Sequence, residues 1–301
     1  FDGNGVFEYA LGFGDGARGI VEIRGGQSSG FALLTTLSIG SPGFRATSGG
    51  TYPACGDIDG DGFDELVVGR GRGGLGLVDV FDDAAANFAW MQEIRLGWDE
   101  YEAANGETHP ELGDIDGDGL DELLVGLGPG GDGFVSVRED QLAGFRRMWS
   151  PTGERGWLRV VTPPGADGAT WPAAVQLDGD SAKEIAVGLG KGSKTRIELL
   201  DDATRRGFSI LPFRAFVLPD GSSALDAGFF GYDLVNGSAR PGAVDLDGDG
   251  VDEIAVQLGT GGQGRVQLLG QGPGGEPTLA GSAWLQVPLW AVAPHGPALA
   301  R

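Results

Sequence analysis

The chain has 301 residues, a formal net charge of −22, 58 glycines and one cysteine. Its negative charge argues against nucleic acid and anionic membrane surfaces as partners, because both carry charge of the same sign. The lone Cys55 rules out a disulfide framework, and no apolar run is long enough to predict a transmembrane segment.

A short acidic block of nine residues recurs five times, and three of its copies are nearly identical. These three copies span residues 57–65, 114–122 and 245–253. Each has Asp at positions one, three, five and eight and Glu at position nine. A fourth copy runs from Gln176 to Glu184 with Lys183 at position eight, and a fifth, from Asp2 to Glu8, begins in mid-motif. The starts at 57, 114, 176 and 245 give a period typical of repeat arrays and propellers.

Each block is followed by two predicted strands joined by a glycine-rich turn. In chain order, the first of these strands covers residues 9–12, 66–69, 123–126, 185–188 and 254–257. The second strand alternates apolar and polar residues, as in Val78-Asp79-Val80. Alternation with β-branched residues between glycines predicts antiparallel hairpins.

Two more runs complete each repeat. Third runs lie at residues 31–39, 88–96, 208–217 and 284–292, and Pro-led segments begin at residues 53, 110, 172, 241 and 297. Each repeat is therefore a four-stranded antiparallel unit that is too small to bury its faces alone. The last segment supplies what the first block lacks. We expect an all-β, five-bladed β-propeller whose ring is closed by pairing of the N- and C-terminal segments.

The uniform repeat predicts a single β-propeller domain over residues 1–301. Its repeats would span about 1–52, 53–109, 110–171, 172–240 and 241–301, with the last strand completing the first blade. Differences in repeat length fall late in each repeat, at residues 97–109, 150–171 and 218–240. Such connections often carry the individual function of a rigid scaffold.

The acidic blocks have the composition of a calcium site. Carboxylates at alternate positions, with Gly where the backbone turns sharply, suit a hard cation that takes many oxygen ligands in flexible geometry. An EF-hand loop would need Glu at position twelve and flanking helices. Val68, Val125 and Val256 stand at that position instead, within predicted strands.

The block, the apolar run after it and the glycine-rich turn together resemble the FG-GAP/VCBS repeats of bacterial surface proteins, which are related to the integrin α-subunit propeller. The resemblance covers essentially the whole chain and includes residues 229–233, similar to an aromatic segment that precedes the next block. It implies calcium ligands at positions one, three and five, a backbone carbonyl at seven and a carboxylate at nine.

Carried onto this sequence, the resemblance implies three ligand sets. These are Asp57, Asp59, Asp61, the Phe63 carbonyl and Glu65; Asp114, Asp116, Asp118, the Leu120 carbonyl and Glu122; and Asp245, Asp247, Asp249, the Val251 carbonyl and Glu253. Position eight, which is Asp64, Asp121 or Asp252, is acidic only in these complete copies. Whether the carboxylate of position eight or of position nine binds the ion therefore stays open.

We expect about three bound Ca²⁺ ions. The copy from Gln176 to Glu184 is predicted to be metal-free, with the Lys183 ammonium at the place of the ion. The copy from Asp2 to Glu8 is also predicted to be metal-free, because Asn4 and Arg301 fall in ligand positions.

No segment predicts catalysis, since His109 and His295 lie outside any metal-spacing or nucleophile motif and the blocks account for the paired carboxylates. We expect a non-enzymatic calcium-binding module, secreted or at the cell surface, for interaction, adhesion or structural assembly. Its partner would be an extracellular protein, a glycan or a further copy of itself. Extracellular modules of this kind bind calcium with dissociation constants of roughly 10⁻⁴ to 10⁻³ M.

Two alternatives compete with this interpretation. Trp98, Trp157 and Trp171 lie in or beside connections, where an aromatic face could stack on a sugar and make the chain a calcium-stabilised lectin. Some polysaccharide lyases also resemble this fold, which keeps a lyase-like enzyme as the less favoured alternative. The abundance of Arg, Ala and Gly over Lys favours a bacterial source.

Overall fold

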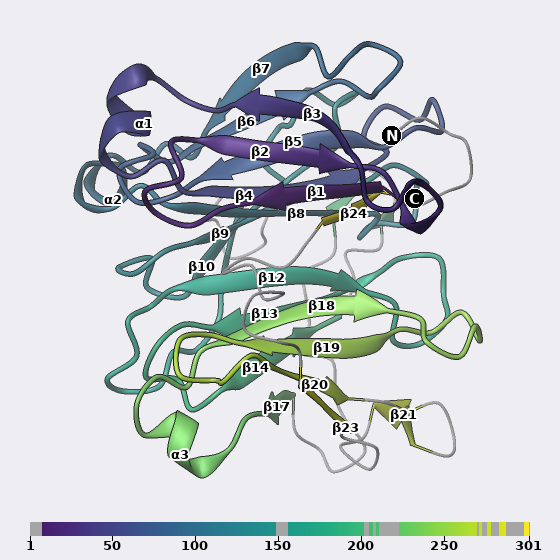
Figure 1. Ribbon diagram of the computed structural model, residues 1–301. Coiled ribbons are helices and arrows are strands. Elements are labelled where there is room, and N and C mark those ends of the chain that lie inside the picture. Colours follow the sequence, from purple (N-terminus) through teal and green to yellow (C-terminus); the bar gives the residue numbers. More distant parts are fainter. Residues whose placement is uncertain are drawn as a thin grey trace.

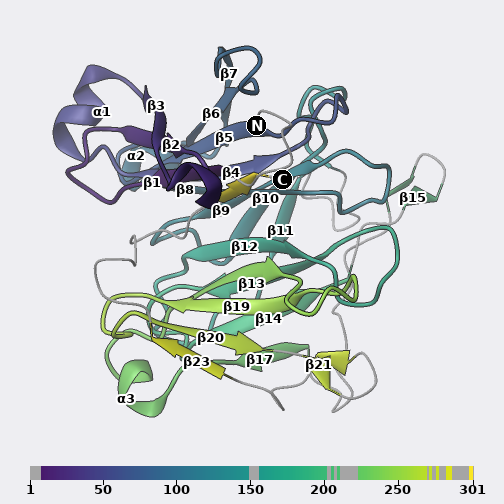
Figure 2. The ribbon, with the colours of Figure 1, turned by 45° about the vertical axis from the view of Figure 1, so that its right-hand side comes forward.

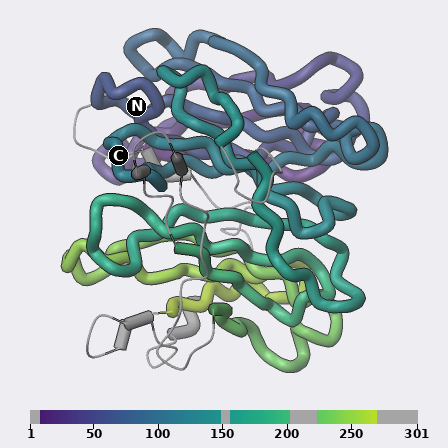
Figure 3. The backbone as a smooth tube through the Cα atoms, turned by 180° about the vertical axis from the view of Figure 1, so that it is seen from behind, coloured from purple at the N-terminus to yellow at the C-terminus, as the bar shows by residue number. Residues whose placement is uncertain are grey.

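The computed structural model describes residues 8–148, 156–201, 205–206, 209–210, 223–269, 271–272, 276–277, 283–286 and 298–300. Within them lie five four-stranded antiparallel sheets, which are called blades 1 to 5 in chain order (Figure 1). The backbone passes from one blade to the next, as the view from behind shows (Figure 3). No described helix is both long and apolar enough to cross a membrane.

The strands of each blade are given from the innermost outward. Blade 1 contains β24 (Ala298–Ala300), β1 (Glu8–Gly12), β2 (Ile20–Arg24) and β3 (Leu33–Ser38). Blade 2 contains β4 (Thr51–Gly56), β5 (Glu65–Arg70), β6 (Leu77–Phe81) and β7 (Trp90–Arg95). Blade 3 contains β8 (Thr108–Gly113), β9 (Glu122–Leu127), β10 (Phe134–Arg138) and β11 (Trp157–Arg159).

The remaining blades follow the same plan. Blade 4 contains β12 (Thr170–Val175), β13 (Glu184–Leu189), β14 (Arg196–Leu200) and β17 (Ala224–Asp226). Blade 5 contains β18 (Ala239–Val244), β19 (Glu253–Leu258), β20 (Arg265–Leu269) and β23 (Ala283–Gln286). Two small hairpins pair β15 (Arg205–Arg206) with β16 (Ser209–Ile210) and β21 (Gln271–Gly272) with β22 (Glu276–Pro277).

The inner strands lie against one another around a common axis: β24 contacts β4, β4 contacts β8, β8 contacts β12 and β12 contacts β18. Strand β1 pairs with β2 on one side and with β24 on the other, with Tyr9 opposite Leu299 (Figure 2). One sheet is thus built from both ends of the sequence. The prediction of an all-β, five-bladed propeller closed by its terminal segments is confirmed.

Two outer strands differ from the sequence-based expectation. In blade 4 the outer strand is β17, whereas of the predicted run at residues 208–217 only Ser209 and Ile210 are described, in the separate β15–β16 hairpin. In blade 3 the outer strand β11 falls inside the connection predicted at residues 150–171. Both strands have three residues, too few to give a periodic sequence signal.

Short helices, which the sequence did not predict, lie in three of the connections between blades. They are α1 (Pro42–Thr47), α2 (Asp99–Ala104) and α3 (Phe230–Asp233), and the 3₁₀ turn η1 (Gln27–Ser29) lies between β2 and β3. In α2, the Tyr101 hydroxyl donates to the Glu107 carbonyl at 2.5 Å and accepts from the Gly128 amide at 2.6 Å. In α3, the Tyr232 hydroxyl likewise donates to the Ser238 carbonyl and accepts from the Gly259 amide, both at 2.7 Å. Each tyrosine thus holds the connection between two blades against the second of these blades.

The hydrophobic core lies between blades. One buried cluster joins Val67 and Val80 of blade 2 to Leu123 and Val125 of blade 3, and another joins Ile197 of blade 4 to blade 5. Glycines in the second strand allow the close approach that this packing requires. A Cβ atom placed on Gly12, Gly69, Gly126 or Gly188 would lie 2.2 to 2.4 Å from a carbonyl oxygen of the next blade's inner strand.

A threonine at the start of an inner strand links its blade to the preceding one. The Thr108 hydroxyl accepts from the Arg70 amide at 2.9 Å and donates to the Leu77 carbonyl at 2.9 Å. Thr51 and Thr170 make the equivalent pair of bonds in their blades. Because these backbone groups are buried between blades, each threonine satisfies polar groups that water does not reach.

We expect the Thr108→Val substitution to lower the free energy of unfolding by about 1–3 kcal/mol, because it leaves the Arg70 amide and the Leu77 carbonyl without this partner while keeping the side-chain shape. Denaturant unfolding at a fixed calcium concentration measures the change. Thr36→Val on the exposed side of β3 is the control and should stay within about 0.5 kcal/mol of the wild type. Equal effects of the two substitutions would contradict the role given to Thr108.

Candidate metal sites

Each acidic block forms the loop between the inner strand and the second strand of its blade. The block at residues 57–65 follows β4 and ends in β5, and the blocks at 114–122, 176–184 and 245–253 occupy the same place in blades 3, 4 and 5. The inner strands all enter these loops at the same end, so the loops lie on one face of the ring. Of the block from Asp2 to Glu8, only Glu8 is among the described residues, and it is buried.

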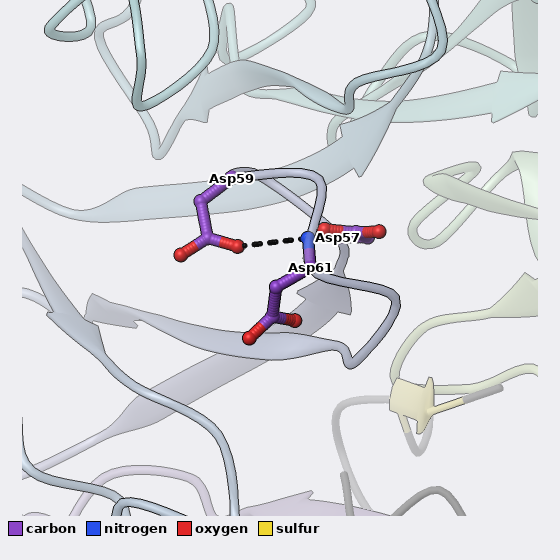
Figure 4. A group of neighbouring side chains, drawn as sticks. All are labelled: Asp57, Asp59 and Asp61. Atoms are coloured by element: carbon purple, nitrogen blue, oxygen red, sulfur yellow. Dashed lines mark hydrogen bonds between the residues drawn. The ribbon is translucent and has the colours of Figure 1, made fainter.

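The backbone of a complete block is wrapped around its own carboxylates. Asp57 accepts from the amides of Gly60 at 2.7 Å and Gly62 at 3.0 Å, and both glycines have positive φ. Asp59 accepts from the Asp61 amide at 3.2 Å (Figure 4). The block at 245–253 repeats these bonds at its corresponding positions. Sharp turns at Gly thus hold the aspartates of one loop together.

Some of the ligands predicted in the blocks at 57–65 and 114–122 come together in the structure. One carboxylate oxygen from each of Asp57, Asp59 and Asp61 lies within 4.8 Å of the others. Asp114, Asp116 and Glu122 form the same kind of group, and so do Asp178, Asp180 and Glu184 in the incomplete fourth block. These acidic groups have the spacing to hold a metal ion.

The glutamate at position nine is the most deeply buried carboxylate of the blocks in blades 2, 3 and 4. Glu65, Glu122 and Glu184 are completely buried. In each, Oε2 accepts from the backbone amide of position two, at 3.0, 3.0 and 2.6 Å. The other oxygen, Oε1, has no hydrogen-bond partner among the described residues. A buried carboxylate oxygen without a donor is unfavourable unless it is protonated or faces a cation.

Burial therefore shifts the titration of these glutamates. It raises the pKa of Glu65 and of Glu184 to about 8, and the pKa of Glu122 to about 10, and the neighbouring aspartates of each block add to the rise. The equivalent Glu253 is half-buried and accepts from the Leu246 amide at 2.9 Å. Position nine thus supplies a carboxylate whose charge requires compensation.

The residue at position eight has a different task, because it contacts the preceding blade. The Asp121 amide donates to the Asp57 carbonyl at 2.9 Å, and the Asp252 amide donates to the Gln176 carbonyl at 2.7 Å. The Asp252 carboxylate also accepts from the Gln176 amide at 2.8 Å. These contacts favour position nine over position eight as the ion ligand and make position eight a link between blades.

The fourth block is closed by hydrogen bonds of its own. Gln176 stands at position one, and its Oε1 accepts from the Gly179 amide at 2.8 Å, as the carboxylate does in the complete blocks. Its Nε2 donates to the carbonyl of Asp180 at 2.8 Å and to that of Ala182, at position seven, at 3.3 Å. An amide group thus occupies acceptors that a cation would otherwise bind.

Lys183 differs from the expectation that its ammonium stands at the place of an ion in its own block. Its amide donates to the Asp114 carbonyl of blade 3, its stem lies beside Gly113, and its charge acts on Glu111. Lys183 stands at position eight and, like Asp121 and Asp252 at that position, contacts the preceding blade. The absence of metal from this block stays a prediction, now based on Gln176.

The three tryptophans considered for sugar binding contact other side chains. Trp98 stacks on Tyr101 with 5.4 Å between ring centroids, and Trp157 lies edge-on to Trp98 at 6.1 Å. Both pack against the core cluster of blades 2 and 3. The Arg147 guanidinium lies 5.7 Å from the centroid of the Trp157 ring.

Trp171 belongs to a polar cluster at the ring axis that the sequence analysis did not identify. Its ring stacks on His109 with 3.4 Å between centroids, and the Arg240 guanidinium lies 4.0 Å from its centroid. Tyr52 and His109 both bond the Glu107 carboxylate. These residues occupy equivalent positions on β4, β8, β12 and β18, but their types differ, so no repeat signal marked them. His295, which the sequence analysis placed outside any catalytic motif, lies outside the described residues.

No protein-family model matches the chain. Among solved structures, it is similar to the exotype rhamnogalacturonan lyase YesX, with 18% identity, a TM-score of 0.38, and coverage of 78% of this chain and 46% of that one. It is also similar to a rhamnogalacturonan lyase from Bacillus licheniformis, with 17% identity, a TM-score of 0.39, and coverage of 78% of this chain and 47% of that one. The Dos1 propeller has 13% identity and a TM-score of 0.44, with coverage of 88% of this chain and 63% of that one. The chain spans about half the length of the two lyases. At these identities and TM-scores, the likeness carries no information on activity.

We expect the thermal stability of the metal-free protein to fall as the pH rises from about 5 to 8. The pKa of the position-nine glutamates is raised from 4.5 to about 8 or above on folding, so the folded chain binds more protons than the unfolded chain in this range. Scanning calorimetry in excess chelator measures the slope. Glu65→Gln should reduce it, and this control separates the buried glutamate from general repulsion among the acidic groups. A stability that rises with pH would contradict the assignment.

Proposed function

We propose that this chain is a non-enzymatic calcium-binding β-propeller of the FG-GAP/VCBS type that serves outside the cell as an interaction, adhesion or assembly module. The observation that carries the proposal comes from blades 2 and 3, where Glu65 and Glu122 are buried beside aspartates of their block and each has one oxygen that no described group satisfies. Glu184 has the same environment, but its block has Gln176 in place of the first aspartate. A bound cation would compensate this charge and complete the polar contacts of the loop.

The donor set favours calcium over other metals. Asp57, Asp59, Asp61 and Glu65, with the Phe63 carbonyl, offer only oxygen atoms, which suit Mg²⁺, Ca²⁺ and Mn²⁺ rather than softer metals. Magnesium requires near-ideal octahedral geometry and usually keeps several waters, whereas calcium accepts six to eight oxygens in flexible arrangements. A loop that supplies several carboxylates and a carbonyl therefore fits calcium best.

Calcium would stabilise the propeller instead of supplying chemistry. Each block joins the inner strand to the second strand of its blade, and in blades 3, 4 and 5 the position-eight residue contacts the preceding blade. An ion in the block would fix both connections at once. Weak sites of this type are filled where calcium is abundant, which supports a location outside the cell.

The described residues offer little support for catalysis. His109 is buried, its Nδ1 contacts the Thr170 carbonyl at 2.8 Å, and its Nε2 contacts Glu107 at 3.0 Å. Both ring nitrogens are thus engaged, and neither is positioned to exchange a proton with a substrate. The lectin alternative has less support as well, because Trp98 and Trp171 stack on protein side chains and Trp157 packs against the core cluster of blades 2 and 3.

Exposed apolar side chains support a protein partner or self-assembly. Phe31, Leu33 and Leu34 in and beside β3 are 47 to 51% exposed, and Trp90 at the start of β7 is 60% exposed. Leu33, Leu34 and Trp90 belong to the outer strands of blades 1 and 2. Apolar groups at the open edge of a sheet are typical of surfaces that bind another chain.

The proposal predicts that the chain binds three calcium ions. Isothermal titration with calcium should give three sites, and Glu122→Gln should lose one of them. Light scattering in millimolar calcium and then in excess chelator shows whether copies associate. Calcium-dependent assemblies indicate a structural module, and a monomer in both conditions indicates a module for a different partner. A wild-type chain without calcium binding would contradict the proposal.

Gln176→Asp should add a fourth calcium site. The substitution replaces the amide that closes the fourth block with a carboxylate and restores the aspartate of the complete blocks. Native mass spectrometry at increasing calcium concentration counts the ions. Gln263→Asp, in the exposed turn between β19 and β20, is a control that adds the same charge away from the blocks. A count that stays at three in the Gln176→Asp variant would show that the fourth block lacks more than its first carboxylate.

A further inference from the structure

Two aspartates outside the acidic blocks lie beside the complete blocks of blades 2 and 3. Asp83 follows β6 and Asp140 follows β10, each at the same offset from the first aspartate of its own block. Both side chains are buried, at 3% exposure. Buried aspartates are uncommon unless paired or bound to a metal, so their surroundings have to account for them.

Both aspartates lie close to the position-nine glutamate of the block in their own blade. One carboxylate oxygen from each of Asp61, Glu65 and Asp83 lies within 4.8 Å of the others. Asp118, Glu122 and Asp140 repeat this arrangement in blade 3. The third strand of the blade thus adds a carboxylate to residues that the loop of the first two strands already provides.

The buried glutamates supply an independent indication of a ligand. Glu65 and Glu122 are completely buried, and the Oε1 atom of each has no hydrogen-bond partner among the described residues. Three carboxylates so close together repel one another strongly in a buried environment. A divalent cation between them would remove both the repulsion and the unsatisfied oxygen.

The turns after β6 and β10 hold the two aspartates in the same orientation. Asp83 Oδ1 accepts from the Ala86 amide at 2.9 Å, and Asp140 Oδ1 accepts from the Ala143 amide at 2.6 Å. The turn is closed in both blades by a second bond, from the Phe88 amide to the Asp83 carbonyl and from the Phe145 amide to the Asp140 carbonyl. One carboxylate oxygen is thereby fixed by the turn.

We infer that Asp83 and Asp140 are calcium ligands, each completing the site of its own blade by binding the ion held by the position-five aspartate and the position-nine glutamate. The inference rests on the proposed calcium binding. Gln271 stands at the same offset in blade 5, and its side chain lies outside the described part of the chain, as does Asp202 in blade 4. Blades 2 and 3 therefore bind calcium more tightly than blade 5, because affinity rises with the number of charged ligands.

Isothermal titration with calcium tests this assignment in the whole chain. We expect two tighter sites and one weaker site in the wild type. Asp83→Asn should weaken one of the tighter sites about 10- to 100-fold, and Asp140→Asn the other, the range typical for loss of a partner at a metal site. Asparagine keeps an oxygen for the Ala86 or Ala143 amide, so the turns are preserved. The melting temperature in chelator checks this point.

Asp82→Asn is the matched control, because Asp82 carries the same charge next to Asp83 and accepts from the Asp83 amide through Oδ1 at 3.0 Å. It should weaken calcium binding less than about threefold, as expected for a charge that does not touch the ion. Equal effects of Asp82→Asn and Asp83→Asn would overturn the inference while leaving the proposed calcium binding intact. A wild-type chain that binds no calcium would overturn both.

Discussion

Contact between neighbouring blades is the constraint on which the whole structure depends, because a four-stranded sheet of this size has no second layer of its own. The buried clusters accordingly join residues of two blades. Close approach requires Gly69 and its equivalents, where a side chain would collide with the next inner strand. Thr108 and its equivalents then satisfy the backbone groups that this approach removes from water.

The candidate metal sites belong to the same system of contacts. Each block turns the chain from the axis of the ring back into its blade, and in blades 3, 4 and 5 its position-eight residue contacts the preceding blade. In blades 3 and 4 the position-nine glutamate next to this residue is completely buried. An ion at this place would be coupled to the geometry of two blades, so calcium, blade packing and the pKa of the glutamates depend on one another.

The repeated features of this structure could be predicted from the sequence. Alternation around Val78 and Val80, the Gly-rich turns and the block spacing were enough for the strands, the blade number and the closure through both chain ends. Features without a repeated residue type could not be predicted. Helices of four to six residues give no periodic pattern, and the axial residues Tyr52, His109, Trp171 and Arg240 differ in type. Asp83 and Asp140 do recur at one offset, but only the fold shows that the turn after the third strand lies beside the block.

Long-wavelength X-ray diffraction from crystals grown in millimolar calcium tests the central claim most directly, because calcium then gives an anomalous signal that water does not. We expect anomalous peaks next to Glu65, Glu122 and Glu253, and none next to Gln176. Blocks without anomalous peaks, in which water or a protonated glutamate satisfies Oε1 of Glu65 and Glu122, would contradict calcium binding as the basis of this propeller.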